Sequence, residues 1–208
     1  MAKSRKFNAL PLSPGQLKNI DDMGYQEMTD IQAESLPTSL AGKDLLAQAA
    51  TGSGKTLAFG LPLVEALDPR GFYAQGLILC PTRELAAQVA DELRKIARYP
   101  GNIKVLTITG GQPIRPQIGS LEHGAQIVVG TPGRIVDHLR KKTLNLSRLS
   151  TLVLDEADRM LDMGFQEDLI KIMDQTPRDR QTLMFSATYP EDIAVLSKQH
   201  QRNPIEVR

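Results

Sequence analysis

A segment of small residues followed by a lysine and a threonine has the composition of a phosphate-binding loop. It reads Ala49-Ala50-Thr51-Gly52-Ser53-Gly54-Lys55-Thr56. Backbone N–H groups of such a loop surround the phosphates of a nucleoside triphosphate, the lysine reaches the β- and γ-phosphates, and the threonine hydroxyl ligates Mg²⁺. The usual pattern begins with Gly, and Ala49 stands at that position. Apolar residues precede the segment and a helical pattern follows it, which is the context that this motif requires.

A second segment that could do chemistry is Asp155-Glu156-Ala157-Asp158, which directly follows the apolar run 152–154. A carboxylate at the end of a strand can hold Mg²⁺ opposite Thr56, and Glu156 is placed to position and deprotonate an attacking water. Asp158 is expected to tie this loop to a neighbouring loop. The same residues also fit an N-cap with acidic residues in the first turn of a helix. The phosphate-binding loop upstream favours the catalytic interpretation.

The bulk composition is ordinary for a globular protein. The sequence has 208 residues, of which 41% are hydrophobic and 24% charged, and its formal net charge is +1, so any basic surface for a polyanion must be local. It has one cysteine, Cys80, which lies in an apolar run, and a single cysteine cannot form an internal disulfide. We expect a buried Cys80 and a reducing, cytoplasmic compartment. No signal peptide and no apolar stretch of about 18 residues are visible, so no membrane partner is expected.

Hydrophobic patterning predicts an alternation of short strands and amphipathic helices. The predicted strands cover 44–48, 76–80, 104–109, 126–130, 151–155, 181–186 and 204–207. The predicted helices cover 13–23, 29–40, 55–67, 84–98, 114–122, 132–141, 166–175 and 191–201. Several strands are continuous apolar runs, which indicates burial on both faces and a parallel sheet between helices. The sequence thus predicts a doubly wound α/β domain that binds its ligands at the carboxyl ends of the strands.

Polar or glycine-rich loops follow most of the predicted strands and are expected to meet at one edge of the sheet. Loops 81–83, 110–112 and 131–134 combine small residues, hydroxyls and arginine. Such loops can bring backbone N–H groups and a guanidinium against the phosphates of a nucleic acid strand. Arg140-Lys141-Lys142 is predicted to be a solvated helix end. The three histidines, His123, His138 and His200, lack the spacing of metal ligands and are predicted to be surface or structural residues.

A series of segments, in the family's order, makes the chain resemble the first RecA-like domain of a DEAD-box ATP-dependent RNA helicase. Gly24 to Gln32 resembles the Q motif, and Phe7 lies upstream where the family carries an aromatic. Ala49 to Thr56 resembles the family's phosphate loop, which normally begins with Ala. The remaining matches are Pro81-Thr82-Arg83-Glu84-Leu85-Ala86 (motif Ia), Gly110-Gly111, Thr131-Pro132-Gly133-Arg134, Asp155-Glu156-Ala157-Asp158 and Ser186-Ala187-Thr188 (motif III). Gly110-Gly111-Gln112-Pro113 and residues 158–165 look most like a bacterial member.

The resemblance implies a role for each matched residue. Gln32 is expected to read the edge of adenine and Phe7 to stack on it, although Phe7 could equally anchor the N-terminus in the core. The residues expected to bind the ATP phosphates are Ala50, Thr51, Gly52, Ser53, Gly54, Lys55 and Thr56. Lys55, Asp155 and Glu156 are the expected catalytic residues, and Thr56 and Asp155 are expected to hold Mg²⁺.

The same resemblance implies an RNA site and residues that couple it to ATP. Asp158, Ser186 and Thr188 are the expected coupling residues. The expected RNA-binding residues are Pro81, Thr82, Arg83, Gly110, Gly111, Gln112, Thr131, Pro132, Gly133 and Arg134. Their contacts would go to the RNA backbone and would therefore be independent of the RNA sequence.

The resemblance also implies a second RecA-like domain, but the sequence contains no H-R-x-G-R-x-x-R segment. We expect residues 1–208 to form a single RecA-like domain, with a Q-motif extension over about 1–40, from a longer monomeric helicase. Alone, this domain is expected to bind ATP with little turnover, because an arginine finger from the second domain is missing. Two alternatives stay open: an ATP- and RNA-binding module without turnover, and a DNA translocase or other P-loop ATPase. The Q motif and the 155–158 segment argue against the second alternative.

Overall fold

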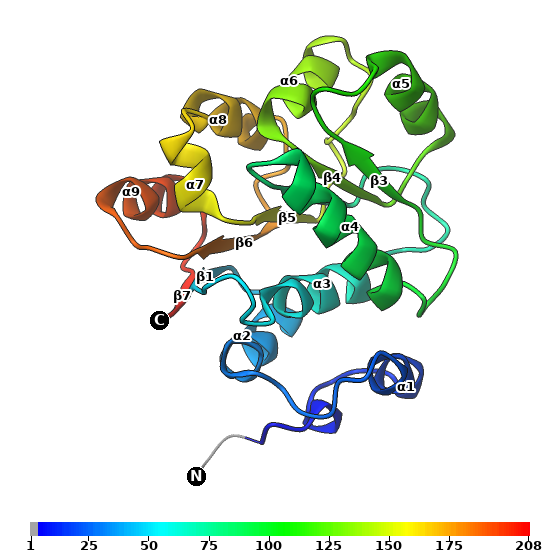
Figure 1. The fold of residues 1–208 in the computed structure, drawn as a ribbon, viewed down its shortest axis with the longest axis vertical. Helices are drawn as coiled ribbons and strands as arrows, with labels where there is room; N and C mark the ends of the chain where they lie inside the picture. Colours follow the sequence, from blue (N-terminus) through cyan, green and yellow to red (C-terminus); the bar gives the residue numbers. More distant parts are fainter. Residues whose placement is uncertain (1–3) are drawn as a thin grey trace.

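The computed structural model describes residues 4–208, which form a seven-stranded parallel sheet between two layers of helices (Figure 1). The strands are β1 (Leu45–Gln48), β2 (Gly76–Leu79), β3 (Val105–Ile108), β4 (Ile127–Gly130), β5 (Thr151–Leu154), β6 (Gln181–Ser186) and β7 (Ile205–Val207). Their order across the sheet is β3-β4-β2-β5-β6-β1-β7, and neighbouring strands are parallel. The fold is the doubly wound α/β architecture that the sequence predicts.

Eight α-helices of the described residues lie at the predicted places, two of them before β1 and the others between strands. The α-helices are α1 (Pro14–Asp22), α2 (Asp30–Leu40), α3 (Lys55–Glu65), α4 (Arg83–Ile96), α5 (Ile114–His123), α6 (Pro132–Arg140), α7 (Ala157–Asp162), α8 (Gln166–Asp174) and α9 (Glu191–His200). Two short elements, α7 and the 3₁₀ helix η1 (Phe7–Ala9), lie outside the predicted set. Elements of this length contain too few residues to show a hydrophobic period.

Each face of the sheet has its own apolar core. In β5, Val153 packs among side chains of α2, α3 and α4, whereas Leu152 and Leu154 pack among side chains of α6, α8 and α9. This alternation follows from the two-residue period of a strand. Cys80 is buried in the first of these cores, as predicted, and burial raises the pKa of its thiol.

Helix starts bring the functional loops to the carboxyl edge of the sheet. Lys55, Arg83 and Pro132 are the first residues of α3, α4 and α6, which follow β1, β2 and β4. Thr82 caps α4 by accepting a hydrogen bond from the backbone N–H of Leu85 at 3.2 Å. Because each of these helices points its N-terminus at the same edge, the positive ends of three helix dipoles lie there.

The N-terminal extension is attached to the rest of the domain by buried polar contacts. Gln16 and Asn19 of α1 donate hydrogen bonds to the carbonyl of Ile96, the last residue of α4, at 3.3 and 3.1 Å. Helix α2 packs against α3. Residues 1–3 of the predicted extension lie outside the described residues. Within residues 4–208, no helix has both the length and the apolar character required to cross a bilayer.

Candidate functional site

The phosphate-binding loop leaves β1 after Gln48 and ends where α3 begins at Lys55. Gly52 and Gly54 have φ angles of 82° and 85°, in the left-handed region that glycine adopts without strain. A Cβ atom at Gly54 would lie 2.6 Å from Nε2 of Gln32, so this position also needs glycine for close contact with α2. The loop therefore presents bare backbone at a helix N-terminus, an arrangement that favours anions.

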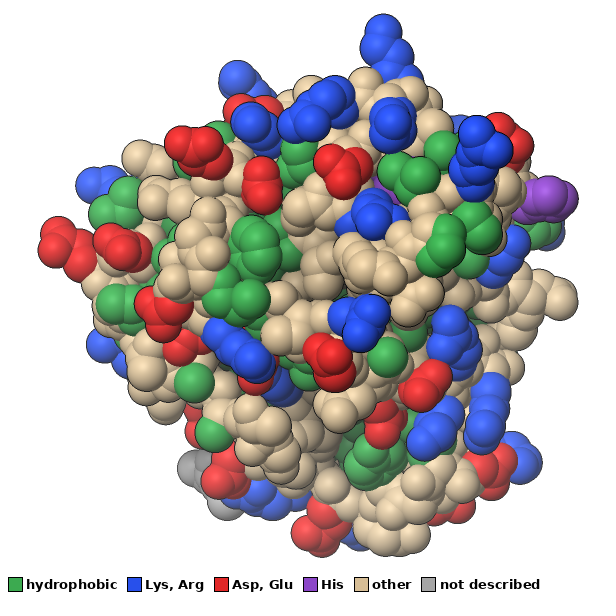
Figure 2. Space-filling model, turned by 45° about the horizontal axis from the view of Figure 1, so that its top comes forward, with side chains coloured by type: hydrophobic (Ala, Val, Ile, Leu, Met, Phe, Trp, Pro, Cys, Tyr) green, Lys and Arg blue, Asp and Glu red, His purple; other side chains and the backbone are tan. Residues whose placement is uncertain are grey.

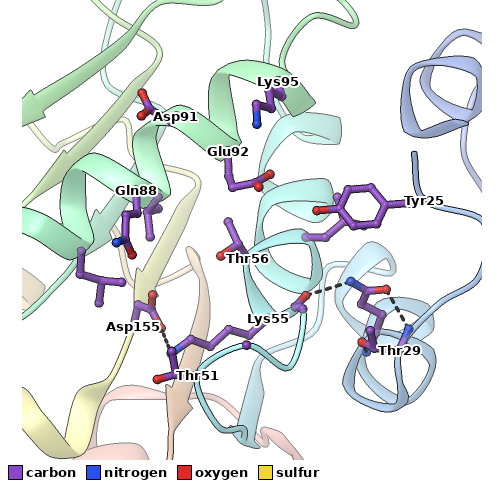
Figure 3. A pocket seen from close by; sticks show the side chains of 16 residues that line it. Tyr25, Thr29, Thr51, Lys55, Thr56, Gln88, Asp91, Glu92, Lys95 and Asp155 are labelled. Carbon is purple, nitrogen blue, oxygen red and sulfur yellow. Dashed lines mark hydrogen bonds and ion pairs between the residues drawn. The ribbon is translucent and has the colours of Figure 1, made fainter. Parts of the chain in front are cut away.

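Lys55 and Asp155 form a buried ion pair beside this loop (Figure 3). Lys55 Nζ lies 2.8 Å from Asp155 Oδ1 and 3.9 Å from Glu156 Oε1. Burial raises the pKa of Asp155, and the adjacent Lys55 ammonium opposes that rise. Among residues 4–208, no hydrogen-bond donor satisfies Asp155 Oδ2. A buried carboxylate oxygen without a partner fits a hard cation such as Mg²⁺, which takes one or two protein ligands and completes its shell with water and phosphate.

A cavity of about 600 Å³ extends from this ion pair to the start of α2. Its lining includes Gln32, Thr56 and Asp155. Figure 3 shows Glu92 of α4 pointing toward the ring of Tyr25, and burial together with the Glu92 charge raises the pKa of the Tyr25 hydroxyl. The volume lies within the range of small-molecule and cofactor sites, roughly 300–1,000 Å³.

Gln32 joins α2 to the phosphate-binding loop. Its Oε1 accepts a hydrogen bond from the Thr29 backbone N–H at 2.9 Å, and Thr29 Oγ1 accepts one from the Gln32 N–H at 3.4 Å, which completes a capping box. Gln32 Nε2 donates to the Gly54 carbonyl at 3.0 Å. A primary amide has two N–H donors and two acceptor lone pairs. Gln32 therefore keeps one donor and one acceptor, the pair that complements N7 and N6 of adenine.

Several residues that line the cavity lie outside the predicted site. They include Tyr25, Gln88, Asp91, Glu92 and Lys95. In the sequence, the four residues from α4 are polar positions of an amphipathic helix, and only the packing of α4 against α3 brings them to the cavity.

The predicted adenine-stacking residue Phe7 occupies a different environment. Its side chain is 5% exposed and belongs to the hydrophobic core. Phe7 lines a second depression together with Leu17 and Ile20, and Tyr25 lines both this depression and the cavity. Burial in the core agrees with an anchor for the N-terminus, and a role in stacking on adenine stays a prediction.

Glu156 has a strained backbone, and side chains besides Lys55 contact its carboxylate. Its φ and ψ angles are 53° and 52°, a conformation that is uncommon for residues other than glycine. Thr51 Oγ1 donates to Glu156 Oε1 at 3.2 Å, and Arg159 Nη1 lies 3.5 Å from Oε2. The residue is also the N-cap of α7. Its place at the start of α7 agrees with the helix-start interpretation, although its side chain makes no capping hydrogen bond, and its role as a catalytic carboxylate stays a prediction.

Asp158 links the acidic loop to the loop that follows β6. Asp158 Oδ2 accepts hydrogen bonds from the N–H and the Oγ1–H of Thr188 at 3.1 and 2.8 Å. Ser186 Oγ donates to the Thr188 carbonyl at 2.7 Å. The pKa of Asp158 lies below its usual value. Partial burial acts to raise this pKa, but the hydrogen bonds from Thr188 and from the Arg159 N–H stabilise the charged carboxylate and have the larger effect. The contact is the tie that the sequence suggests, and its role in coupling stays a prediction.

The three loops predicted to contact nucleic acid lie side by side, because β3, β4 and β2 are adjacent in the sheet. The Gly110 N–H donates to Thr131 Oγ1 at 3.3 Å, and Arg134 Nη1 donates to the Gln112 carbonyl at 2.7 Å. Thr131 and Arg134 thereby join the loop after β4 to the loop after β3. These contacts build one continuous surface from segments that are separate in the sequence.

Gly111, in the loop after β3, leaves room for Arg83 of the third loop, which follows β2. Its φ angle is 78°, and a Cβ atom there would lie 2.9 Å from Nη1 of Arg83. Arg83 itself is exposed. The glycine therefore allows the guanidinium of Arg83 to approach the loop after β3, which places two arginines, Arg83 and Arg134, near Gln112.

Charges on the visible surface are mixed in sign. Figure 2 shows Lys and Arg side chains interspersed with Asp and Glu side chains over the face in view. The net charge of the whole sequence is +1. Net charge therefore does not mark a polyanion site, and the expected contacts of Arg83 and Arg134 with RNA stay predictions.

The fold and these motifs define a RecA-like nucleotide-binding domain, and comparison with known proteins places it in a family. Residues 29–196 match the family described as DEAD/DEAH box helicase. The chain is 54% identical over 201 residues to the ATP-dependent RNA helicase DbpA of Escherichia coli. It is 47% identical over 203 residues to the ATP-dependent RNA helicase CshA of Listeria monocytogenes. The chain belongs to the DEAD/DEAH box helicase family.

A solved structure agrees with this assignment. The crystal structure of a DEAD box protein from the hyperthermophile Methanococcus jannaschii matches with a TM-score of 0.93 and 43% sequence identity, over 99% of this chain and 56% of that chain. The expected family and the expected fold are both confirmed. The matches to these two helicases span 97% and 98% of this chain. They span only 44% and 39% of the helicases' own length. The chain thus spans less than half the length of these curated relatives.

Proposed function

We propose that this chain is the N-terminal RecA-like domain of an ATP-dependent RNA helicase that locally unwinds or remodels RNA. The observation that carries the proposal is the single cavity lined by Gln32, Lys55, Thr56 and Asp155. It combines a base-reading amide, a phosphate-binding lysine and two oxygen ligands for a cation. The relatives named as ATP-dependent RNA helicases support the same function.

In this proposal different residues of the cavity bind different parts of ATP. The free donor and acceptor of Gln32 select adenine over guanine, because guanine presents an acceptor where adenine presents its amino group. The backbone of the 50–54 loop and Lys55 hold the phosphates. Asp155 Oδ2 and the Thr56 hydroxyl would hold Mg²⁺, which neutralises phosphate charge when bound.

Glu156 is the proposed base for hydrolysis. The Thr51 hydroxyl and the Arg159 guanidinium orient its carboxylate, and a carboxylate retains further lone pairs for a water molecule. Little turnover is expected from this domain alone. An arginine finger stabilises the charge that develops on the transferring phosphoryl group in the transition state, and it raises the rate by roughly 10³–10⁵ in related NTPases. The family supplies that arginine from a second RecA-like domain.

The proposed RNA site is the surface formed by the loops after β2, β3 and β4. Arg134 and Arg83 provide guanidinium groups, and the start of α6 at Pro132 provides backbone dipoles for a phosphate. The Asp158–Thr188 link connects the acidic loop beside the ATP cavity to the loop after β6. We propose that this link carries the coupling between ATP and RNA, which in the longer protein accompanies closure of the two domains.

The test compares ATP turnover and RNA binding by the wild-type chain and its Glu156→Gln variant. Slow turnover by the wild type that falls further in Glu156→Gln, with ATP binding retained in both, supports a catalytic half-site. Equal background rates in both proteins would instead favour an ATP- and RNA-binding module without turnover. Stimulation by DNA as strong as by RNA, measured in a longer protein that contains both RecA-like domains, would favour a DNA translocase.

A further inference from the structure

A buried group of polar side chains connects α5 to the proposed RNA surface. We call it the Gln117 cluster, and it consists of Thr109, Gln117, Arg134, His138 and Thr143. Gln117 Nε2 donates to the Thr109 carbonyl at 3.0 Å, and Gln117 Oε1 lies 3.1 Å from Arg134 Nη1 and 2.9 Å from His138 Nε2. His138 Nδ1 lies 2.7 Å from Thr143 Oγ1. Gln117 is 8% exposed and His138 is 0% exposed.

One arrangement of protons satisfies every member of this cluster. Arginine has only donors, so the atom of Gln117 that faces Arg134 must be the acceptor Oε1. The same oxygen faces His138 Nε2, which must therefore carry a proton. When the ring is neutral, His138 Nδ1 accepts a hydrogen bond from the Thr143 hydroxyl, which also lies 3.2 Å from the His138 carbonyl. At the other end, the donor Nε2 of Gln117 faces the Thr109 carbonyl, which requires the same orientation of the amide.

The charges around His138 agree with a neutral ring. Burial lowers the pKa of His138, and the charges of Arg134 and Lys141 lower it further, while Asp137 opposes them. A second positive charge beside the buried part of Arg134 would be unfavourable. His138 is thus held as a neutral hydrogen-bond donor toward Gln117.

The cluster fixes Arg134 in the place where a phosphate would meet it. Arg134 Nη1 is shared between Gln117 Oε1 and the Gln112 carbonyl, and the side chain of Arg134 is only 15% exposed. Arg134 Nε lies 3.7 Å from Asp137 Oδ2, so of the five N–H donors of the guanidinium the two on Nη2 remain for a ligand. A long side chain that is already ordered loses less conformational entropy on binding than a mobile one.

We propose that His138 and Gln117 are positioning residues for RNA binding: they hold Arg134 and the 109–112 loop in the arrangement that receives an RNA phosphate. The proposal rests on the proposed function, because it needs Arg134 to contact RNA. His138 is fully buried and contacts no ligand itself. It acts through Gln117, whose single amide joins α5, α6 and the end of β3.

A matched pair of substitutions at His138 tests the role of one nitrogen. The amide nitrogen of a glutamine reaches the position of Nε2, so His138→Gln keeps a donor toward Gln117. The shorter asparagine reaches only the position of Nδ1, so His138→Asn loses the donor toward Gln117 and keeps an amide group beside Thr143. We expect His138→Asn and Gln117→Leu to weaken binding of a single-stranded RNA oligonucleotide roughly tenfold, about the loss of one hydrogen bond to a charged group. His138→Gln should bind within about twofold of the wild type.

The measurement is fluorescence anisotropy of labelled RNA with the 208-residue chain, with ATP affinity and thermal unfolding measured on each variant. Arg134→Ala is the reference. If Arg134→Ala weakens RNA binding and His138→Asn binds like the wild type, the positioning role is overturned while the RNA surface stands. If Arg134→Ala binds RNA like the wild type, or the wild type does not bind RNA, the proposed RNA site itself fails and the positioning role with it.

A spectroscopic signature tests the same inference without any substitution. Long-range ¹H–¹⁵N spectra of the wild-type chain near neutral pH distinguish the two neutral tautomers of a histidine. The proposal requires His138 to carry its proton on Nε2. A proton on Nδ1, or a charged ring, would contradict the hydrogen-bond chain from Thr143 to Arg134 even if the His138 variants failed to fold.

Discussion

Replacing Gln32 should affect stability and base selection together, because one amide serves both. In the structure, the Gln32 side chain is buried and makes two hydrogen bonds, one to the Thr29 backbone and one to the Gly54 carbonyl. Each is worth about 1 kcal/mol, so Gln32→Ala should destabilise the fold by about 2 kcal/mol. For a domain of this size that is a fall in Tm of roughly 4–8 °C. Gln26→Ala, the same change at an exposed glutamine before α2, should stay within about 0.5 kcal/mol of the wild type.

The same substitution removes the donor and the acceptor that Gln32 would offer to adenine. Losing two hydrogen bonds of about 1 kcal/mol each corresponds to roughly 30-fold in affinity. We therefore expect Gln32→Ala to lose most of its preference for ATP over GTP, while Gln26→Ala retains it. Urea denaturation gives the stability, and calorimetric titration with both nucleotides gives the ratio. A Gln32→Ala protein as stable as Gln26→Ala, or one with an unchanged ATP-to-GTP ratio, would refute this reasoning.

Three further predictions use other parts of the site. Gly111→Ala should destabilise the fold by about 1–2 kcal/mol, because its φ is positive and Arg83 must move; Gly110→Ala, with open space around it, should be close to neutral in urea denaturation. Stability should fall as pH drops below about 6.5, the unfolded pKa of histidine, because burial and Arg134 lower the folded pKa of His138, so the unfolded chain binds more of that proton than the folded chain does. His138→Gln should show a smaller fall in pH-dependent unfolding, and an unchanged slope would contradict this assignment. Asp158→Ala should leave ATP binding unchanged but reduce the effect of RNA on it, since the link to Thr188 is lost; full coupling in the variant would exclude the link as its route.

The sheet was predictable because its strands have a pattern that few other elements share. Runs such as 127–129 and 152–154 are apolar at every position, and strands buried on both faces of a parallel sheet need that pattern. Once the sheet is parallel, its carboxyl edge gathers the loops that follow β1, β2, β4 and β5. The positions of Lys55 and Asp155 on the same side of the molecule follow from that geometry.

Contacts between distant helices were not predictable in the same way. Gln117 on α5 and His138 on α6 are ordinary polar residues of amphipathic helices in the sequence, and only the packing of the two helices brings their side chains together. The same holds for Glu92 on α4 and Tyr25 before α2, which meet in the cavity because α4 packs against α3. Hydrophobic period reports which face of a helix is buried, but not which polar groups meet at its margin.

The most direct test of the account is calorimetric titration of the 208-residue chain with ATP, ADP and GTP in the presence of Mg²⁺, for the wild type and Lys55→Ala. The account predicts adenine-selective binding by the wild type. It predicts weaker binding by Lys55→Ala, because the loop then lacks its phosphate-binding charge and Asp155 loses its partner. Equal affinity for GTP and ATP, or equal affinity of both proteins for ATP, would contradict the assignment of the cavity as an adenine nucleotide site.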